Sequence, residues 1–147
     1  MSLPSFDGST GRLPPGEHQA TWEEVVERFG FNERRRQLLD GLAEALVLLA
    51  DAGCTRAWIN GSFVTSKEEP GDFDVAWDES GVDFDTLDEI FFEMGEGRRM
   101  QKNRFGGELL PNVVEIKSGL SFADFFQNER DTSRKGIVVI DPRSIEK

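Results

Sequence analysis

The spacing of apolar side chains predicts two consecutive helices in the first third of the chain. The first covers residues 21–29, where Thr21 and Glu24 have the spacing of a capping box. The second begins after Asn32 and ends before Gly53, a residue type that commonly stops helices. Within this second helix, leucine and alanine recur at i, i+3, i+4 and i+7, the pattern of a helix that lies on a core.

Shorter apolar runs, bounded by glycine, proline or charged residues, predict strands. Residues 56–60 and 72–77 are separated by a polar connection, and residues 135–141 form a clear final strand. One or two further strands are expected within residues 105–116, interrupted by Pro111 and the asparagine after it.

The remaining segments carry weaker patterns. Helices are predicted over residues 84–94 and 121–128, and the charged stretch 95–104 is predicted to be a loop. Residues 1–20 are rich in Gly, Pro and Ser and are predicted to form an extended arm that is neither helix nor strand. The order of elements implies one α+β (α/β) domain over residues 21–147, with helices on at least one face of its sheet.

Composition narrows the classes of protein to consider. The chain has 147 residues, 37% of them hydrophobic, which is enough for a real core. Cys54 is the single cysteine, so no internal disulfide can form, and no targeting or membrane-spanning segment is recognisable. We therefore expect a cytoplasmic protein with no membrane association. A net charge of −11 argues against extensive binding of duplex nucleic acid.

The pattern most suggestive of chemistry is Gly61-Ser62 followed by Asp72-x-Asp74. Because side chains alternate along a strand, the two aspartates are expected on the same side of the sheet. Neighbouring carboxylates repel each other unless a cation lies between them, and Mg²⁺ is bound by one or two carboxylates together with phosphates of a substrate. A Gly-Ser turn can offer N–H groups and a hydroxyl to such phosphates.

Each half of this pattern has a simpler interpretation when taken alone. Gly61-Ser62 is compatible with an ordinary turn at the end of a strand, and the two aspartates with solvent-facing strand residues. An Asp-x-Asp pair also occurs in nucleotide-sugar glycosyltransferases, which are generally longer than this chain.

The combined pattern resembles the core of the polymerase-β-like nucleotidyltransferase superfamily, most closely over residues 56–78. The wider chain is similar to a group of short bacterial and phage proteins within that superfamily. The shared segments are LPPGEHQATWEEVVERFG, GSFVTSKEEPGDFD, FGGELLP and KGIVVID. The resemblance implies a minimal domain with a mixed sheet packed by helices.

The resemblance also implies transfer of a nucleoside monophosphate from an NTP to an acceptor, with two Mg²⁺ ions, or Mn²⁺, held about 4 Å apart by carboxylates. Asp72 and Asp74 would be shared metal ligands. A third carboxylate usually comes from a later strand, and Glu115 fits that local pattern best, with Glu108 as its rival. If neither faces the metals, the site would bind a nucleotide without turning it over.

Further roles follow from the same resemblance. Ser62 and the backbone of Gly61 would hold the β- and γ-phosphates, with Lys67 or Lys102 pairing with the triphosphate. The acceptor would be a protein, a tRNA or a small molecule, as in toxin–antitoxin or phage-defence systems. We expect the chain to lack the helical C-terminal domain of larger relatives, and a homodimer or a partner subunit to complete the site. The alternative is a non-catalytic nucleotide-binding or regulatory module with the same fold.

Overall fold

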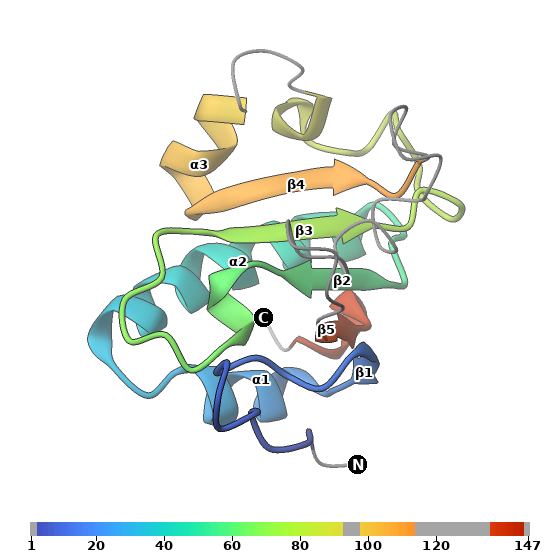
Figure 1. Cartoon of the computed structure of the whole chain (residues 1–147). Coiled ribbons are helices and arrows are strands. Elements are labelled where there is room, and N and C mark those ends of the chain that lie inside the picture. Colours follow the sequence, from blue (N-terminus) through green and yellow to red (C-terminus); the bar gives the residue numbers. More distant parts are fainter. Residues whose placement is uncertain (1–2, 93–97, 114–135, 146–147) are drawn as a thin grey trace.

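The computed structural model describes residues 3–92, 98–113 and 136–145. Within these ranges the protein is a mixed α+β structure, as the sequence predicts, and its mixed sheet has five strands (Figure 1). The strands are β1 (Gly16–Gln19), β2 (Ala57–Asn60), β3 (Phe73–Trp77), β4 (Gly107–Pro111) and β5 (Gly136–Ile140).

The sheet has the order β1-β5-β2-β3-β4. β2 lies at its centre, antiparallel to both β3 and β5, while β4 runs parallel to β3 and β1 parallel to β5. The two outer pairs are therefore parallel and need long connections, whereas the β2–β3 pair is joined by the polar segment that follows Gly61.

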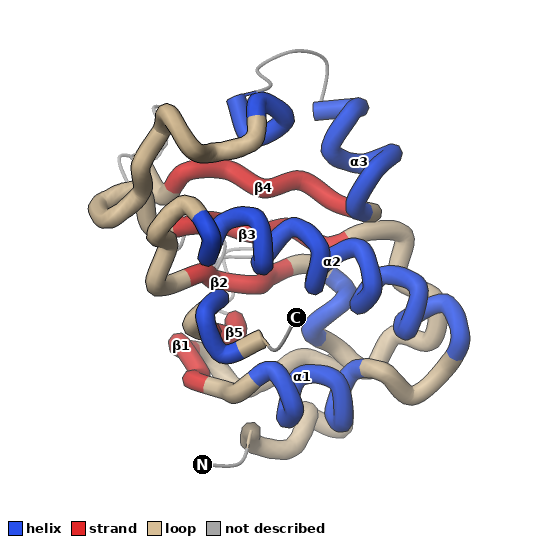
Figure 2. Tube along the Cα trace, turned by 180° about the vertical axis from the view of Figure 1, so that it is seen from behind, coloured by secondary structure: helices blue, strands red, loops and turns tan. Residues whose placement is uncertain are grey.

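The long helix α2 (Glu33–Asp51) and the shorter α1 (Trp22–Phe29) cover one face of this sheet, and α3 (Arg99–Phe105) packs against the start of β4 (Figure 2). Alternate residues of β2, β3 and β4 point into the core beneath the helices, among them Ile59, Val75 and Leu109. On the opposite face Trp58, Ala76, Ile137 and Val139 form a smaller buried cluster. Inner strands buried on both faces explain their nearly continuous apolar sequences.

Both predicted N-terminal helices are confirmed, together with their caps. The Thr21 hydroxyl accepts a hydrogen bond from the Glu24 N–H at 3.2 Å, and the Glu24 carboxylate accepts one from the Thr21 N–H at 3.2 Å. The Asn32 side chain caps α2 by accepting from the Arg35 N–H at 2.9 Å. Gly53 follows the helix end with a φ of 102°, a conformation that glycine adopts without strain.

The prediction of an arm without secondary structure is wrong for residues 16–19, which form β1. This short strand extends the sheet by pairing with β5, from Gly16 opposite Gly136 to Gln19 opposite Val139. Earlier in the arm, Leu3 and Leu13 are buried in the main core. An isolated run of four residues with little apolar content gives no strand signal, because its stability comes from pairing with β5.

Two predictions between β3 and β4 are also wrong. In place of a helix over residues 84–94, the described part of that range contains turns and a single 3₁₀ turn, η2 (Glu89–Phe92). The carboxylates of Asp83 and Asp88 accept hydrogen bonds from backbone N–H groups two residues later, at 3.0 Å in both cases, and thus compete with helical bonding.

The second error is the loop predicted over residues 95–104, which contains most of α3. This helix has little apolar patterning of its own and is fixed by two fully or nearly fully buried residues. Phe105 stacks on Phe91 with ring centroids 5.8 Å apart, and Gln101 bonds to neighbouring backbone. The helix predicted over residues 121–128 lies outside the described residues.

The final strand is confirmed as β5, and the apolar segment before Pro111 as β4. No helix in the described ranges is long and apolar enough to cross a bilayer.

Candidate functional site

The Gly-Ser turn lies at the end of the central strand and against the first residues of its neighbour. Gly61 directly follows β2 with a φ of 91°, a left-handed conformation, and Ser62 opens the 3₁₀ turn η1 (Ser62–Val64). A side chain at position 61 would place its Cβ 3.2 Å from Asp74 Oδ2. Glycine is therefore needed both for the backbone angle and for the close approach of the turn to the Asp74 carboxylate.

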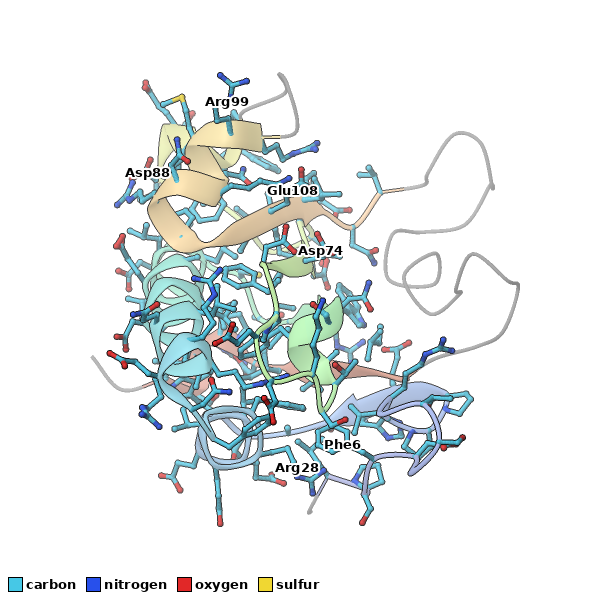
Figure 3. All side chains as sticks on the ribbon, turned by 60° about the vertical axis from the view of Figure 1, so that its left-hand side comes forward. Phe6, Arg28, Asp74, Asp88, Arg99 and Glu108 are labelled. Carbon is cyan, nitrogen blue, oxygen red and sulfur yellow. The ribbon has the colours of Figure 1, made fainter. Side chains whose placement is uncertain are left out.

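Asp74 and Glu108 are brought together by strand register. They are partners in the parallel β3–β4 pair, so their side chains lie on the same face of the sheet. Figure 3 shows the two carboxylates next to each other on neighbouring strands. Their chain neighbours Val75 and Leu109 point to the opposite face, into the core. The apolar residues thus set which face the acidic residues occupy.

A third oxygen lies on the other side of Asp74. Asn60 is the partner of Asp74 in the antiparallel β2–β3 pair and is only 4% exposed. Its Oδ1 has no hydrogen-bond partner among the described residues. A buried polar atom without a partner is costly, and such atoms recur where a ligand or an ion completes their bonding.

Lys102 approaches this group from α3. Gln101, with no exposed surface, accepts a hydrogen bond from the Leu109 N–H at 2.7 Å and donates one to the Ile90 carbonyl at 2.9 Å. These bonds fix α3 beside β4 and bring Lys102 Nζ within 3.6 Å of Glu108 Oε1. The side chains of Lys102 and Glu108 are 44% and 22% exposed, so the pair adds little to stability but partly neutralises the carboxylate.

Asp72 lies immediately before β3, which begins at Phe73. It lines a groove of about 580 Å³ between α2 and α3, together with Arg34 and Lys102, the lysine that pairs with Glu108. Among the described residues, no three His, Cys, Asp or Glu side chains gather closely enough to hold a metal ion. Glu115, the other predicted third carboxylate, lies outside the described residues.

Ser62 and Lys67 line a separate cavity of about 420 Å³ on the other side of the turn. Of the two lysines predicted to meet a triphosphate, Lys67 lies in the cavity that Gly61 and Ser62 share, whereas Lys102 pairs with Glu108.

The segment that carries Ser62 is held by hydrogen bonds from a buried cation, the guanidinium of Arg35. Arg35, on α2, has no exposed surface, and its guanidinium donates to five backbone carbonyls. The acceptors are Phe29, Ser62, Phe63, Thr65 and Lys67, at 3.2, 3.4, 2.6, 2.6 and 2.7 Å. Desolvation lowers the pKa of Arg35 to about 10, which leaves it charged at neutral pH.

A protein-family model matches residues 4–141, nearly the whole chain, and its family is described as a family of unknown function, DUF6932. The chain belongs to the DUF6932 family. No curated protein and no solved structure is significantly similar to it.

Within this DUF6932 chain, sequence reasoning identified Gly61, Asp74 and Glu108, which the structure brings together, but it missed Asn60. Asn60 immediately precedes the Gly-Ser turn in the sequence, and this position is the signal by which it could have been identified. Its burial and its register with Asp74 arise only from the pairing of β2 with β3.

Proposed function

We propose that this chain is a Mg²⁺-dependent nucleotidyltransferase with a polymerase-β-like core, and that Asp74 and Glu108 are its metal-binding carboxylates. The observation that carries the proposal is the register of these two residues on adjacent parallel strands. The pairing of β2 with β3 also places Asp74 against Gly61, at the turn where phosphates would bind. The metal, the phosphates and the acceptor would then meet at the place where β2 ends and where β3 and β4 begin.

The donor set fits Mg²⁺. Two carboxylates on one face supply hard oxygen ligands, and the unpartnered Asn60 Oδ1 adds a third oxygen beside Asp74. Mg²⁺ commonly takes only one or two protein carboxylates and completes its coordination with water and substrate phosphates. When bound, the ion would offset the negative charge of the triphosphate and lower the pKa of the attacking hydroxyl.

The residues of the chain would act mainly by positioning, which is the chief demand of phosphoryl-type transfer. Ser62 and the Gly61 backbone would orient the β- and γ-phosphates, and Lys67 would balance their charge. In the reaction, a bond forms between the acceptor oxygen and the α-phosphorus. The bond from the α-phosphorus to the bridging oxygen breaks, pyrophosphate leaves, and the hydroxyl proton passes to solvent.

A binding module without catalysis is the second candidate. It is favoured by the ion pair between Lys102 and Glu108 and by the lack of a third acidic ligand among the described residues. In this alternative the ammonium group of Lys102 would neutralise Glu108 in place of a metal ion, and the nucleotide would bind without reacting.

Incubation with each α-³²P-labelled NTP and Mg²⁺ or Mn²⁺, with and without cell lysate, separates the two candidates. The proposal predicts label on an acceptor with the wild type and with Glu27→Gln, an exposed charge-matched control on α1. It predicts loss of label with Asp74→Asn and with Glu108→Gln. Label that persists in both site variants would refute the assigned metal ligands, and nucleotide binding without label under all conditions would favour the binding module.

A further inference from the structure

The N-terminal arm forms a closed loop with a defined shape. The Asp7 carboxylate accepts hydrogen bonds from the Ser9 N–H at 2.8 Å, the Ser9 hydroxyl at 2.7 Å and the Thr10 N–H at 3.3 Å. The Asp7 N–H donates to the Arg12 carbonyl at 2.7 Å, and the Gly11 N–H donates to the Asp7 carbonyl at 2.8 Å. The guanidinium of Arg12 also interacts electrostatically with Asp7. Residues 7–12 therefore present a fixed surface.

This loop docks on the segment that follows the Gly-Ser turn. The Ser66 N–H donates to the Gly11 carbonyl at 2.8 Å, and Arg12 pairs with Thr65 in an antiparallel bridge. Gly11 has a φ of 73°, and a Cβ at this position would collide with the Ser66 hydroxyl. The contact thus combines a backbone hydrogen bond with a close approach of Gly11 to the Ser66 side chain, and the backbone angle at Gly11 favours glycine.

The arm is also anchored on both sides of the loop. Leu3 and Leu13 are buried in the core. Arg28 of α1 donates to the carbonyls of Leu3 and Pro4 at 2.8 and 2.5 Å and lies over the Phe6 ring. The chain is thus anchored on both sides of the loop that carries Arg12.

Docking of the arm turns the neighbourhood of Ser62 into a cavity of about 420 Å³ with an unusual lining for this protein. The chain carries 28 acidic residues and a net charge of −11, yet the described lining contains two cations, several hydroxyl groups and no carboxylate. The lining residues are Thr10, Arg12, Gly61, Ser62, Val64, Thr65, Ser66, Lys67 and Gly136. Local positive charge with hydroxyl donors favours an anion with many acceptor oxygens.

We infer that the docked arm completes a polyphosphate-binding site and that Arg12 is a phosphate-binding residue of it. A guanidinium can bind phosphate oxygens through two parallel hydrogen bonds, which a lysine cannot do. Arg12 and Lys67 would contact the phosphate chain from opposite segments of the cavity, with Ser62 and Thr10 as hydroxyl donors. The identification of the anion with the triphosphate of an NTP rests on the proposed function, whereas the anion site itself rests on the cavity.

The test is metal-free titration of inorganic tripolyphosphate by calorimetry. We expect the wild type to bind and Arg12→Gln to bind at least about tenfold more weakly, since one charge-assisted pair is lost. Lys67→Gln should weaken binding in the same direction. The matched control is Arg36→Gln, which removes an equal charge from an exposed position on α2 and should change the affinity less than about twofold.

Two further variants keep the outcome interpretable. Arg12→Lys retains the charge and should restore part of the affinity, which a folding defect would not predict. Gly11→Ala should loosen the arm and weaken binding although it removes no charge. Near-wild-type affinity in Arg12→Gln, an equal loss in Arg36→Gln, or no measurable binding by the wild type would each overturn the inference.

The tripolyphosphate titration tests the anion site, and the labelling experiment tests nucleotidyl transfer, so each can fail without the other. Asp74→Asn abolishes label transfer under the proposed function, but it removes a negative charge beside Gly61 and should not weaken metal-free tripolyphosphate binding. Tripolyphosphate binding that depends on Arg12, with no labelled product in any assay, would sustain the anion site and reject nucleotidyl transfer. Label transfer with an unaltered Arg12→Gln titration would do the reverse.

Discussion

Replacement of Arg35 by methionine should strongly destabilise the protein and release the segment that carries Ser62. Methionine has a similar length and fills much of the same volume, so the change chiefly removes the charge and the hydrogen-bond donors. Five backbone carbonyls would lose the same partner. Phe31 and Phe63, which lie 4.4 and 5.4 Å from the guanidinium carbon, would lose a cation–π contact.

The expected loss of unfolding free energy is about 3–5 kcal/mol. A single buried acceptor left without a partner costs about 1–3 kcal/mol, but part of the segment from residue 62 to 67 is near solvent and can be hydrated. The charge itself is costly to bury, which further reduces the net contribution of the intact arrangement. For a chain of this size the loss corresponds to a decrease of roughly 10–15 °C in Tm.

Urea unfolding followed by far-UV circular dichroism measures this loss, and hydrogen exchange reports on residues 62–67 separately. Arg35→Lys keeps the charge but reaches fewer carbonyls, so it should fall between the wild type and Arg35→Met. Arg36→Met, at the exposed neighbouring position, is the control and should change stability by less than about 0.5 kcal/mol. A loss below about 1 kcal/mol in Arg35→Met, or unchanged exchange of residues 62–67, would show that Arg35 does not hold this segment.

Two further predictions concern the core. Gly41→Ala should lower the free energy of unfolding in urea by about 1–3 kcal/mol, although alanine favours helices. The reason is that a Cβ on α2 would collide with the Phe105 carbonyl of α3. Equal or greater stability of the variant would contradict this packing. Cys54 is fully buried, and desolvation raises its pKa to about 11, so the native protein at pH 8 should not react with a disulfide reagent. The thiol should react promptly in denaturant, and native-state reaction at the rate of a free thiol would show that the site is open.

The helices that sequence predicted well are those whose signals are local. The capping box at Thr21 and the side-chain cap of Asn32 involve residues three positions apart, and the leucine spacing of α2 reflects the helix's own period. The final strand was predicted for a similar reason, since five consecutive buried residues in β5 leave a continuous apolar run. In these places local preference and tertiary packing agree.

The errors fall where tertiary contacts decide the structure. β1 exists because β5 provides a partner, and α3 because Gln101 and Phe105 are buried against β4 and η2. Residues 84–92 fail to form the predicted helix because aspartate side chains bond to nearby backbone N–H groups. None of these effects produces a hydrophobic period that could be detected in advance.

The residues of the candidate site likewise include some that local sequence features predict and others that tertiary contacts bring together. The Gly-Ser turn and the strand alternation at Asp74 could be predicted from the chain alone, because glycine's backbone freedom and the alternation of a strand are local properties. The position of Glu108 beside Asp74 could not be predicted in this way, since the register of two parallel strands depends on the packing of α3 and the core. Only docking of the arm placed Arg12 beside Ser62, because residues so distant in sequence meet through folding alone.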